Sequence, residues 1–424
     1  MTNRTYGALA LTALFAPKVF ALGLIDESQA TLTTRNFYLE RDYRSDVGQD
    51  KAQEWAQGFI FRFKSGYSQG NQGYGLDVLG LSGFKLDSSP SRTGTDLLPV
   101  SRTDGRAADE YSELGLTGKL RYSKTDLKAG TLDDVFIPFV FASQSRLLPQ
   151  TFRGAALVSN EWENLTLRGT WFDRTNKRNS TDYEPLSLAA PNQRFNAKAQ
   201  SDQATFLAVE YHPKNLYQAR FYHGDIQDLY RMEYADFKRS WPIGSDVFTT
   251  DFRGFYAYED GSAKAGDVDY QNLTSTFTYQ TGAHLFNLGY QHAGGDTAMP
   301  YLAGTEILVL SEYLMSSDFV SANEKAWQAK YVYDFAGLGT PGLKTTLRYM
   351  KGYDIKLPER LGGSGLSESE KHIEVSYVIQ SGSPLAGLNF RARYSIYRND
   401  FASTASMRDE NQLRLNVDYS WKLW

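Results

Sequence analysis

The stretch Leu413-Arg414-Leu415-Asn416-Val417-Asp418-Tyr419-Ser420-Trp421-Lys422-Leu423 alternates strictly between apolar and polar residues, and Trp424 ends the chain. Successive side chains of a β-strand point to opposite faces, so this stretch predicts a strand with one apolar and one polar face. Its length suits a tilted strand that crosses a membrane, which needs about 9–11 residues. A half-buried strand of a soluble sandwich would show the same alternation, so the interpretation depends on whether the pattern recurs.

The same period of two recurs along most of the chain and predicts many strands. Clear examples are residues 32–38, 55–64, 74–78, 114–122, 165–171, 207–211, 217–221, 273–279, 286–290, 327–335, 343–349, 373–379 and 388–396. Short turns alternate with long polar linkers, as in outer-membrane barrels. A soluble β-propeller would instead show a repeat of one blade length, and we find none. At roughly 22 residues per strand and connection, we expect an all-β fold, a transmembrane antiparallel β-barrel of about 18 strands.

Residues 1–21 have the features of a signal peptide. Arg4 gives a positive start, residues 7–15 are apolar but too few to span a bilayer as a helix, and Val19-Phe20-Ala21 ends in a suitable cleavage site. We expect cleavage after Ala21, with Gly23 as the second choice. Residues 22–424 then form one barrel domain in the outer membrane of a Gram-negative cell.

The composition excludes several other classes of protein. The chain has no cysteine, which excludes a disulfide framework and a cysteine metal site. No apolar run reaches the roughly 18 residues of a transmembrane helix, and a net charge of −4 does not favour nucleic acid as a partner. Mean hydropathy is negative although 14% of the residues are aromatic, as expected for alternating strands with aromatic girdles. We predict no cofactor and no metal.

The long linkers are the places to look for function. Residues 88–111, 132–154, 174–201 and 296–323 are the longest, and the second of them contains the apolar run Phe136 to Phe141. Apolar loop residues facing water would be unfavourable, so we expect this linker to fold into the barrel and pack there, narrowing the pore. An aromatic or cyclic solute is the alternative reason for the run.

Basic residues are frequent on the polar faces of the expected strands. The three guanidinium groups of Arg391, Arg393 and Arg414 fall on two neighbouring strands with a single evident acid nearby. Basic groups along a confined wall raise the local concentration of anions. Arginine suits carboxylates because its planar group makes two parallel hydrogen bonds and stays charged. We therefore expect a pathway for small carboxylates.

The chain also resembles a known family, the OprD-type outer-membrane carboxylate channels (the Occ porins). The resemblance rests on motifs that follow one another along nearly the whole mature chain. They are Asn36-Phe37-Tyr38-Leu39-Glu40-Arg41-Asp42-Tyr43-Arg44, Glu54-Trp55-Ala56-Gln57-Gly58-Phe59, Gly75-Leu76-Asp77-Val78-Leu79-Gly80, Ser145-Arg146-Leu147-Leu148-Pro149-Gln150-Thr151-Phe152-Arg153-Gly154, Gly295-Asp296-Thr297 with Pro300-Tyr301-Leu302, and Asn323-Glu324-Lys325-Ala326-Trp327-Gln328.

The resemblance implies a barrel whose third and seventh loops fold inward and form a narrow eyelet, with a ladder of basic residues that guides small carboxylates through it. The residues that match the family's positions fall into two groups. The eyelet residues are Arg146 and Arg178 with Asp133, Asp134 and Asp296 as acidic partners, and the ladder consists of Arg35, Arg62, Arg391, Arg393 and Arg414. Residues Gly304 to Leu310 of the seventh loop are less rich in glycine than the family suggests.

The resemblance also implies partners. They are outer-membrane lipid, small carboxylates (cyclic or aromatic acids, or amino acids), and the barrel-assembly machinery, which would recognise the C-terminal strand. The family commonly ends in phenylalanine, and Trp424 keeps an aromatic residue there. The expected assembly is a monomer or a weak trimer.

Two rival functions need different features. A barrel enzyme, such as a peptidase, needs a Ser-His-Asp or metal constellation, and the five histidines belong to no such motif. A plugged structural barrel would not need basic residues on its inner face. We therefore expect a substrate-selective porin for passive diffusion and not an enzyme.

Overall fold

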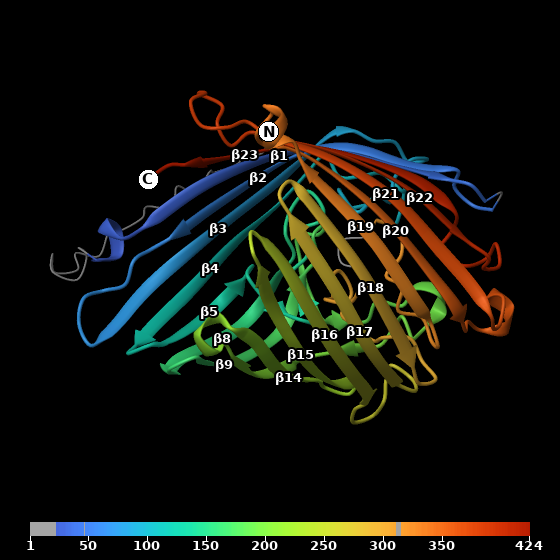
Figure 1. Cartoon of the computed structure of the whole chain (residues 1–424), viewed down its shortest axis with the longest axis horizontal. Coiled ribbons are helices and arrows are strands. Elements are labelled where there is room, and N and C mark those ends of the chain that lie inside the picture. Colours follow the sequence, from blue (N-terminus) through green and yellow to red (C-terminus); the bar gives the residue numbers. More distant parts are fainter. Residues whose placement is uncertain (1–22, 46, 311–314) are drawn as a thin grey trace, which may run out of the picture.

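The computed structural model describes residues 23–45, 47–310 and 315–424. The predicted signal peptide, residues 1–21, lies outside the described residues. One large antiparallel sheet dominates the described part and closes on itself, because the first strand pairs with both the second and the last (Figure 1).

The closed sheet contains 19 strands in the described residues, of which the two-residue strand β10 (Tyr183–Glu184) pairs only with β9. The other 18 form the wall, as predicted. They are β1 (Gln29–Tyr43), β2 (Lys51–Lys64), β3 (Gln72–Asp87), β4 (Glu110–Tyr122), β5 (Thr125–Leu132), β8 (Thr151–Trp162), β9 (Leu165–Asn176), β13 (Ala204–Tyr211), β14 (Tyr217–Ile226), β15 (Tyr230–Ile243), β16 (Asp246–Glu259), β17 (Asp269–Thr281), β18 (His284–Gly294), β19 (Lys325–Asp334), β20 (Leu343–Ile355), β21 (Leu366–Val378), β22 (Asn389–Asn399) and β23 (Glu410–Lys422).

The two faces of the wall differ as the alternation predicts. Outward positions carry large apolar side chains in the open, such as Leu114 (74% exposed) and Leu273 (71%). Inward positions carry polar side chains that are buried, such as Gln291 and Glu370 (both 0%). Such a wall presents an apolar surface to lipid and polar groups to its interior. None of the helices in the described part of the chain is long and apolar enough to cross a membrane.

The connections are short at one end of the barrel and long at the other. In outer-membrane barrels the long loops lie on the extracellular side. Four of the long connections matter below and are named here by residue number. Loop 2 is 88–109, loop 3 is 133–150, loop 4 is 177–203 and loop 7 is 295–324.

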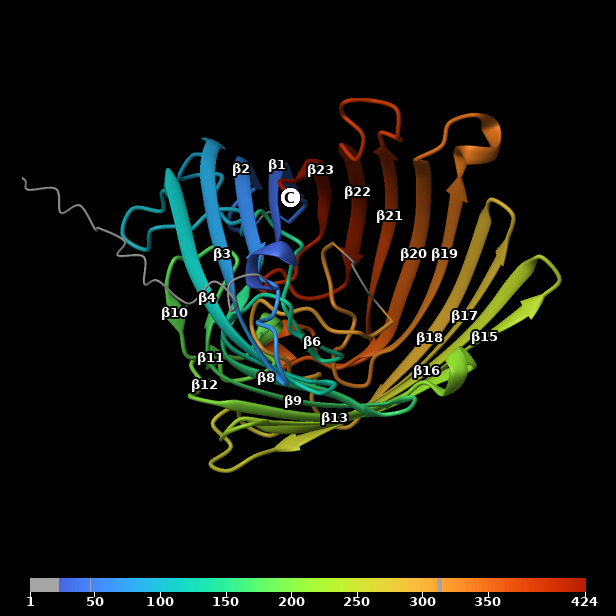
Figure 2. The ribbon, with the colours of Figure 1, turned by 90° about the vertical axis from the view of Figure 1, so that its left-hand side faces the viewer.

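Loops 3 and 7 fold into the barrel and contact each other, as predicted. A bridge pairs Phe141 of loop 3 with Glu306 of loop 7, and another pairs Leu188 of loop 4 with Leu302 of loop 7. The small hairpin of β6 (Phe136–Ile137) and β7 (Val140–Phe141) in loop 3 lies within the ring of wall strands (Figure 2).

The apolar run of loop 3 packs against the wall. Phe139 is fully buried, and its ring centre lies 5.9 Å from that of Phe206 on β13. Phe139 can come this close because the facing residue on β14 is Gly224, where a Cβ would lie only 2.6 Å from the Phe139 ring. Phe136 differs, because 51% of it remains exposed. Packing therefore explains most of the run.

We expect Gly224→Ala to displace loop 3 from the wall. The added methyl group overpacks the contact with Phe139 and should destabilise the barrel by about 1–3 kcal/mol. Gly169→Ala is the matched control, because a Cβ there meets only Leu207 at 3.8 Å. Thermal unfolding of both purified variants in detergent checks this, and equal stability of the two would contradict the proposed contact.

Candidate functional site

The inward loops and the wall enclose a cavity of about 190 Å³ between loops 3, 4 and 7 and strands β22 and β23. Among the described residues, its charged lining consists of Arg146, Arg178, Arg393, Arg414, Glu306 and Asp318. Four of these six side chains are cationic and two are anionic. The structure therefore brings four residues that the sequence singled out to one small space.

The wall contributes a column of guanidinium groups. Arg393 on β22 lies directly opposite Arg414 on β23, and Arg391 lies opposite Asn416, one inward position closer to the short turns. Arg393 donates a hydrogen bond to the Asn416 Oδ1 at 3.0 Å. All three arginines therefore occupy inward positions of the wall, as the alternation of apolar and polar residues predicts.

Among the described residues, the carboxylate that lies within 4.0 Å of both Arg391 and Arg393 is that of Glu374. The Glu374 oxygens lie 3.7 Å from Arg391 Nε and 4.0 Å from Arg393 Nε. Both Nε atoms are buried and have no hydrogen-bond partner. Two cations thus share one loosely placed anion, and both keep donors for another acceptor.

Arg414 is held more firmly than these two. It donates to the backbone oxygen of Met315 in loop 7 at 2.8 Å and to the side chain of Gln412, and only 2% of it is exposed. Its neighbour Glu370 accepts from the backbone N–H groups of Met315 and Ser316 at 3.1 and 3.0 Å. Arg414 therefore fastens loop 7 to the wall as well as lining the cavity.

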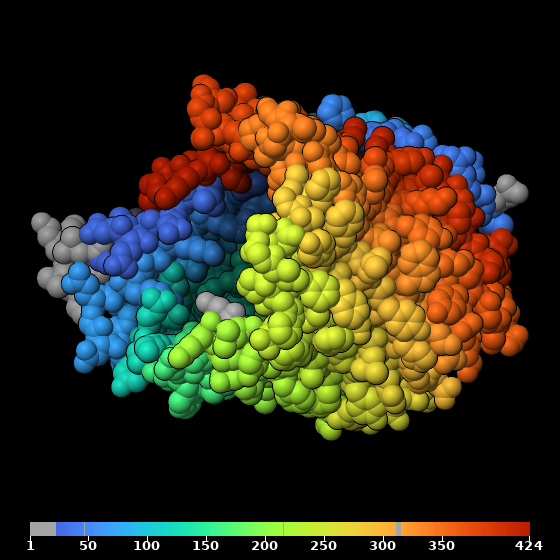
Figure 3. All heavy atoms as spheres, in the orientation of Figure 1, coloured from blue at the N-terminus to red at the C-terminus, as the bar shows by residue number. Residues whose placement is uncertain are grey.

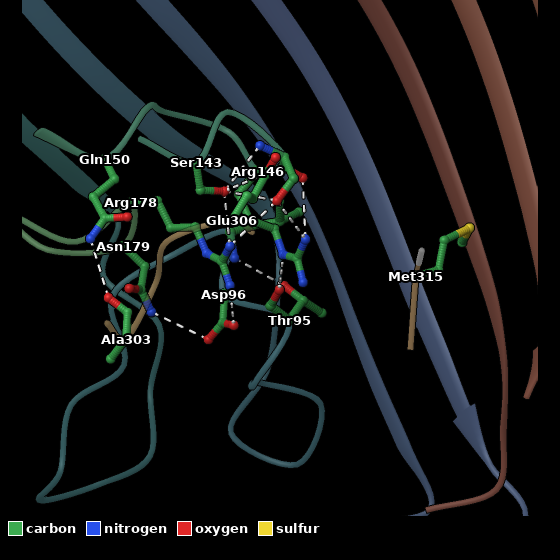
Figure 4. A network of polar contacts seen from close by, with 12 residues as sticks. Thr95, Asp96, Ser143, Arg146, Gln150, Arg178, Asn179, Ala303, Glu306 and Met315 are labelled. Carbon is green, nitrogen blue, oxygen red and sulfur yellow. Dashed lines mark hydrogen bonds and ion pairs between the residues drawn. The ribbon is translucent and has the colours of Figure 1, made fainter. Parts of the chain in front are cut away.

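The loops contribute the second pair of cations, which lie side by side in Figure 4. Arg146 Nε donates to the backbone oxygen of Thr95 at 3.0 Å. Arg178 lies 3.1 Å from the Asp96 carboxylate and donates to the Ser143 hydroxyl at 3.1 Å. Loops 2, 3 and 4 are thereby tied together at the cavity.

The pKa values of these loop groups reflect an excess of positive charge. Burial and the nearby Arg178 guanidinium lower the pKa of Arg146 below its ordinary value. Burial alone would raise the pKa of Asp96, but Arg178 and Arg146 outweigh it and hold that pKa below the ordinary value. Both directions indicate that an additional anion would be stabilised in the cavity.

The acidic side of the cavity comes from loop 7. Glu306 accepts a hydrogen bond from the Ser143 hydroxyl at 2.8 Å. Asp318 lies 2.6 Å from Arg194 and accepts from the Tyr301 hydroxyl at 2.7 Å. The sequence shows both acids in this long linker but assigns them no place at the eyelet, because nothing in its pattern separates them from other loop acids.

The acids expected at the eyelet lie elsewhere. Asp133 is 2.6 Å from Arg62, Asp134 is 2.5 Å from Lys128, and Asp296 is an exposed residue 3.4 Å from Lys356. None of the three lines the cavity between loops 3, 4 and 7. Asp133 and Asp134 instead line a separate small cavity together with Arg62 and Lys128.

Two expected ladder residues also have partners of their own. Arg35 lies 2.8 Å from Asp418 and donates to the backbone oxygens of Gln144 and Arg146 at 3.1 and 2.8 Å. Arg35 thus binds the backbone of loop 3 to strand β1 of the wall. Arg62 lies inward but outside this cavity, paired with Asp133.

Comparisons with known proteins agree with this architecture. The family described as "outer membrane porin, OprD family" matches residues 22–423. The chain is 36% identical over 415 residues to the porin-like protein GalP of Pseudomonas putida, covering 97% of this chain and 96% of that protein. It is 34% identical over 428 residues to porin D of Pseudomonas aeruginosa, covering 96% and 94%.

Solved structures show the same likeness. OccAB2 of Acinetobacter baumannii has a TM-score of 0.90 and 38% identity, covering 95% of this chain and 100% of that one. OpdK of Pseudomonas aeruginosa, crystallised with vanillate, has a TM-score of 0.87 and 37% identity with the same coverage.

We expect Glu306→Gln to make ion passage more anion-selective. The substitution removes one of the two anionic side chains of the cavity lining, while an amide oxygen can still accept from Ser143. Asp296→Asn is the matched control, because Asp296 lies on the exposed part of the same loop. The reversal potential across a planar bilayer under a salt gradient measures this, and an equal shift in both variants would count against a selective role of the cavity.

Proposed function

Because this chain belongs to the OprD family of outer membrane porins, we propose that it lets small carboxylates diffuse selectively and passively across the outer membrane. The observation that supports this most directly is the narrow cavity in which Arg146, Arg178, Arg393 and Arg414 face two carboxylates. A confined, positively charged passage concentrates anions and lowers their barrier to entry.

The arginines are placed to pass a carboxylate along the barrel. The loop arginines Arg178 and Arg146 share one cavity with Arg414 and Arg393 of the wall, and Arg391 lies one inward position closer to the short turns. Successive inward positions of a strand lie roughly 7 Å apart, so one carboxylate can be held by a second guanidinium before it leaves the first. Passage needs contacts that are favourable but exchangeable, and the sharing of one Glu374 carboxylate leaves donors of Arg391 and Arg393 available for this.

Arginine makes the passage selective for planar acids. Each guanidinium offers a rigid pair of donors that matches a carboxylate and stays charged at any physiological pH. The rest of the cavity lining includes Phe141, Ile307 and Leu308. These side chains would accommodate a compact apolar group next to the carboxylate, which favours cyclic or aromatic acids over amino acids.

The rival functions receive less support. The relatives are porins, which are channels and not enzymes. A plugged structural barrel gives no reason for two inward arginines to share Glu374. The signal peptide, recognition of the last strand by the assembly machinery, and a monomer or weak trimer remain predictions.

We expect the double substitution Arg391→Ala with Arg393→Ala to reduce carboxylate uptake by about tenfold or more, because local anion concentration falls with the lost charges. The measurement is uptake of labelled benzoate and acetate into liposomes that contain the purified barrel.

The matched control removes two arginines from the exposed loop 2, Arg102→Ala with Arg106→Ala. A difference in gel mobility between heated and unheated samples shows whether each variant folds. If the folded Arg391/Arg393 variant takes up benzoate and acetate as fast as the control variant, the proposed role of these arginines in carboxylate passage is refuted.

A further inference from the structure

Four cations lie on the outer face of four neighbouring wall strands. They are Lys325 on β19, Lys351 on β20, Lys371 on β21 and Arg398 on β22. Each cation lies at an outward position of its strand. On each strand the outward residues between the cation and the short turns are mainly apolar, so the cation lies on the side of the long loops. Lys351 and Arg398 both lie opposite Ser369, one on each side of it. The cations therefore form a belt where the apolar band of this wall ends.

Three of the four lack a carboxylate partner. Lys325 lies 2.8 Å from Asp354. Within the described residues, no carboxylate oxygen lies within 4.0 Å of the charged groups of Lys351, Lys371 or Arg398. Lys351 donates to the Ser367 hydroxyl at 2.8 Å, and Arg398 donates to the Asn411 side chain and the backbone oxygen of Glu410, both at 3.0 Å.

Three outward cations elsewhere on the wall are arranged differently. Lys51 lies 3.4 Å from Glu40, Arg231 lies 3.1 Å from Asp225, and Arg153 pairs with Asp173. Each of these has a neighbouring acid of the same chain, while Arg239 on β15 stacks on the Trp241 ring. Lys351, Lys371 and Arg398 have neither arrangement among the described residues, so they are open to an anion from outside the protein.

An apolar groove adjoins the belt on the lipid-facing surface. It has a volume of about 610 Å³ and includes Lys371 in its lining. Its other outward lining residues include Phe286, Leu288, Leu347, Ile373, Tyr394 and Ile396, from β18 to β22. This wall is labelled in Figure 1 and its atoms, yellow to orange, are seen in the same orientation in Figure 3. A groove of this shape in a membrane wall fits an acyl chain.

We propose that this wall binds a phosphorylated glycolipid with several acyl chains from the outer leaflet, with its phosphates on Lys351, Lys371 and Arg398 and one chain in the groove. The belt lies toward the long loops, which face outward in outer-membrane barrels. Lysine and arginine side chains there can extend to the level of lipid headgroups, and charge-assisted contacts with phosphate are strong.

The spacing of the cations favours more than one phosphate. Adjacent strands lie about 4.8 Å apart, so the Cα atoms of Lys351 and Arg398 are separated by roughly 10 Å. A headgroup with two phosphates on neighbouring sugars gives each end of the belt a phosphate of its own, and its several chains also cover the groove.

The test compares the wild-type barrel with the triple variant Lys351→Gln, Lys371→Gln, Arg398→Gln. Native mass spectrometry in detergent measures binding of purified hexa-acylated, bis-phosphorylated lipid A. Each basic residue near an anionic lipid contributes roughly a factor of five, so the triple variant should bind on the order of a hundredfold more weakly. The matched control, Lys51→Gln, Arg153→Gln, Arg231→Gln, removes the same charge from the acid-paired sites and should bind like wild type.

A second variant tests the groove without changing charge. Ala329→Trp places an indole in the groove, whose lining includes Ala329, and should weaken lipid A binding several-fold while acetate conductance stays as in wild type.

Equal binding of lipid A by the Gln triple variant and wild type overturns the proposal. So does binding of phosphatidylglycerol, or of lipid A stripped of phosphate, as tightly as intact lipid A. Unchanged acetate conductance in every variant confirms that the barrel is folded, and none of these outcomes bears on the carboxylate ladder.

Discussion

Hydrogen bonding of the backbone in a medium without water is the constraint on which this structure depends. No lipid group can satisfy an exposed N–H or C=O, so a sheet that crosses the membrane must close and leave no edge. The pairing of β1 with both β2 and β23 achieves this. Closure then gives every wall strand one lipid face and one interior face, and the period of two in the sequence follows from it.

Interior polarity has a consequence for the loops. A wide barrel would be an open aqueous hole, so selectivity requires something to fill it. Loop 3 does so because part of its surface is as apolar as a protein core, with Phe139 buried against Phe206. Loop 7 does so through apolar residues such as Leu302 and Val309, which lie in the same buried cluster as Phe139, and through polar contacts of Arg414 and Glu370 at Met315 and Ser316. The passage for solutes is the space that remains between loop 3 and loop 7.

The strands and the inward direction of Arg391, Arg393 and Arg414 could be predicted from the sequence, because alternation alone decides which face a strand residue occupies. The loop part of the site could be predicted only as far as a family motif reached, which placed Arg146 and Arg178 at the cavity. Loop side chains follow no period, so Glu306 and Asp318 could not be separated from Asp133, Asp134 and Asp296. Nor could the sequence show that Arg35 and Arg414 would also hold loops in place, since those contacts are to backbone oxygens far along the chain.

The two proposals rest on the same feature of the wall, the incomplete pairing of its charges. Arg62 and Lys51 each have an acid of the same chain to themselves. Arg391 and Arg393 share Glu374 inside the barrel, while Lys351 and Arg398 have only neutral acceptors outside it among the described residues. A cation held in a low-dielectric wall is costly unless an anion reaches it. Under the two proposals that anion comes from what each face meets, a passing solute on the inside and a lipid headgroup on the outside.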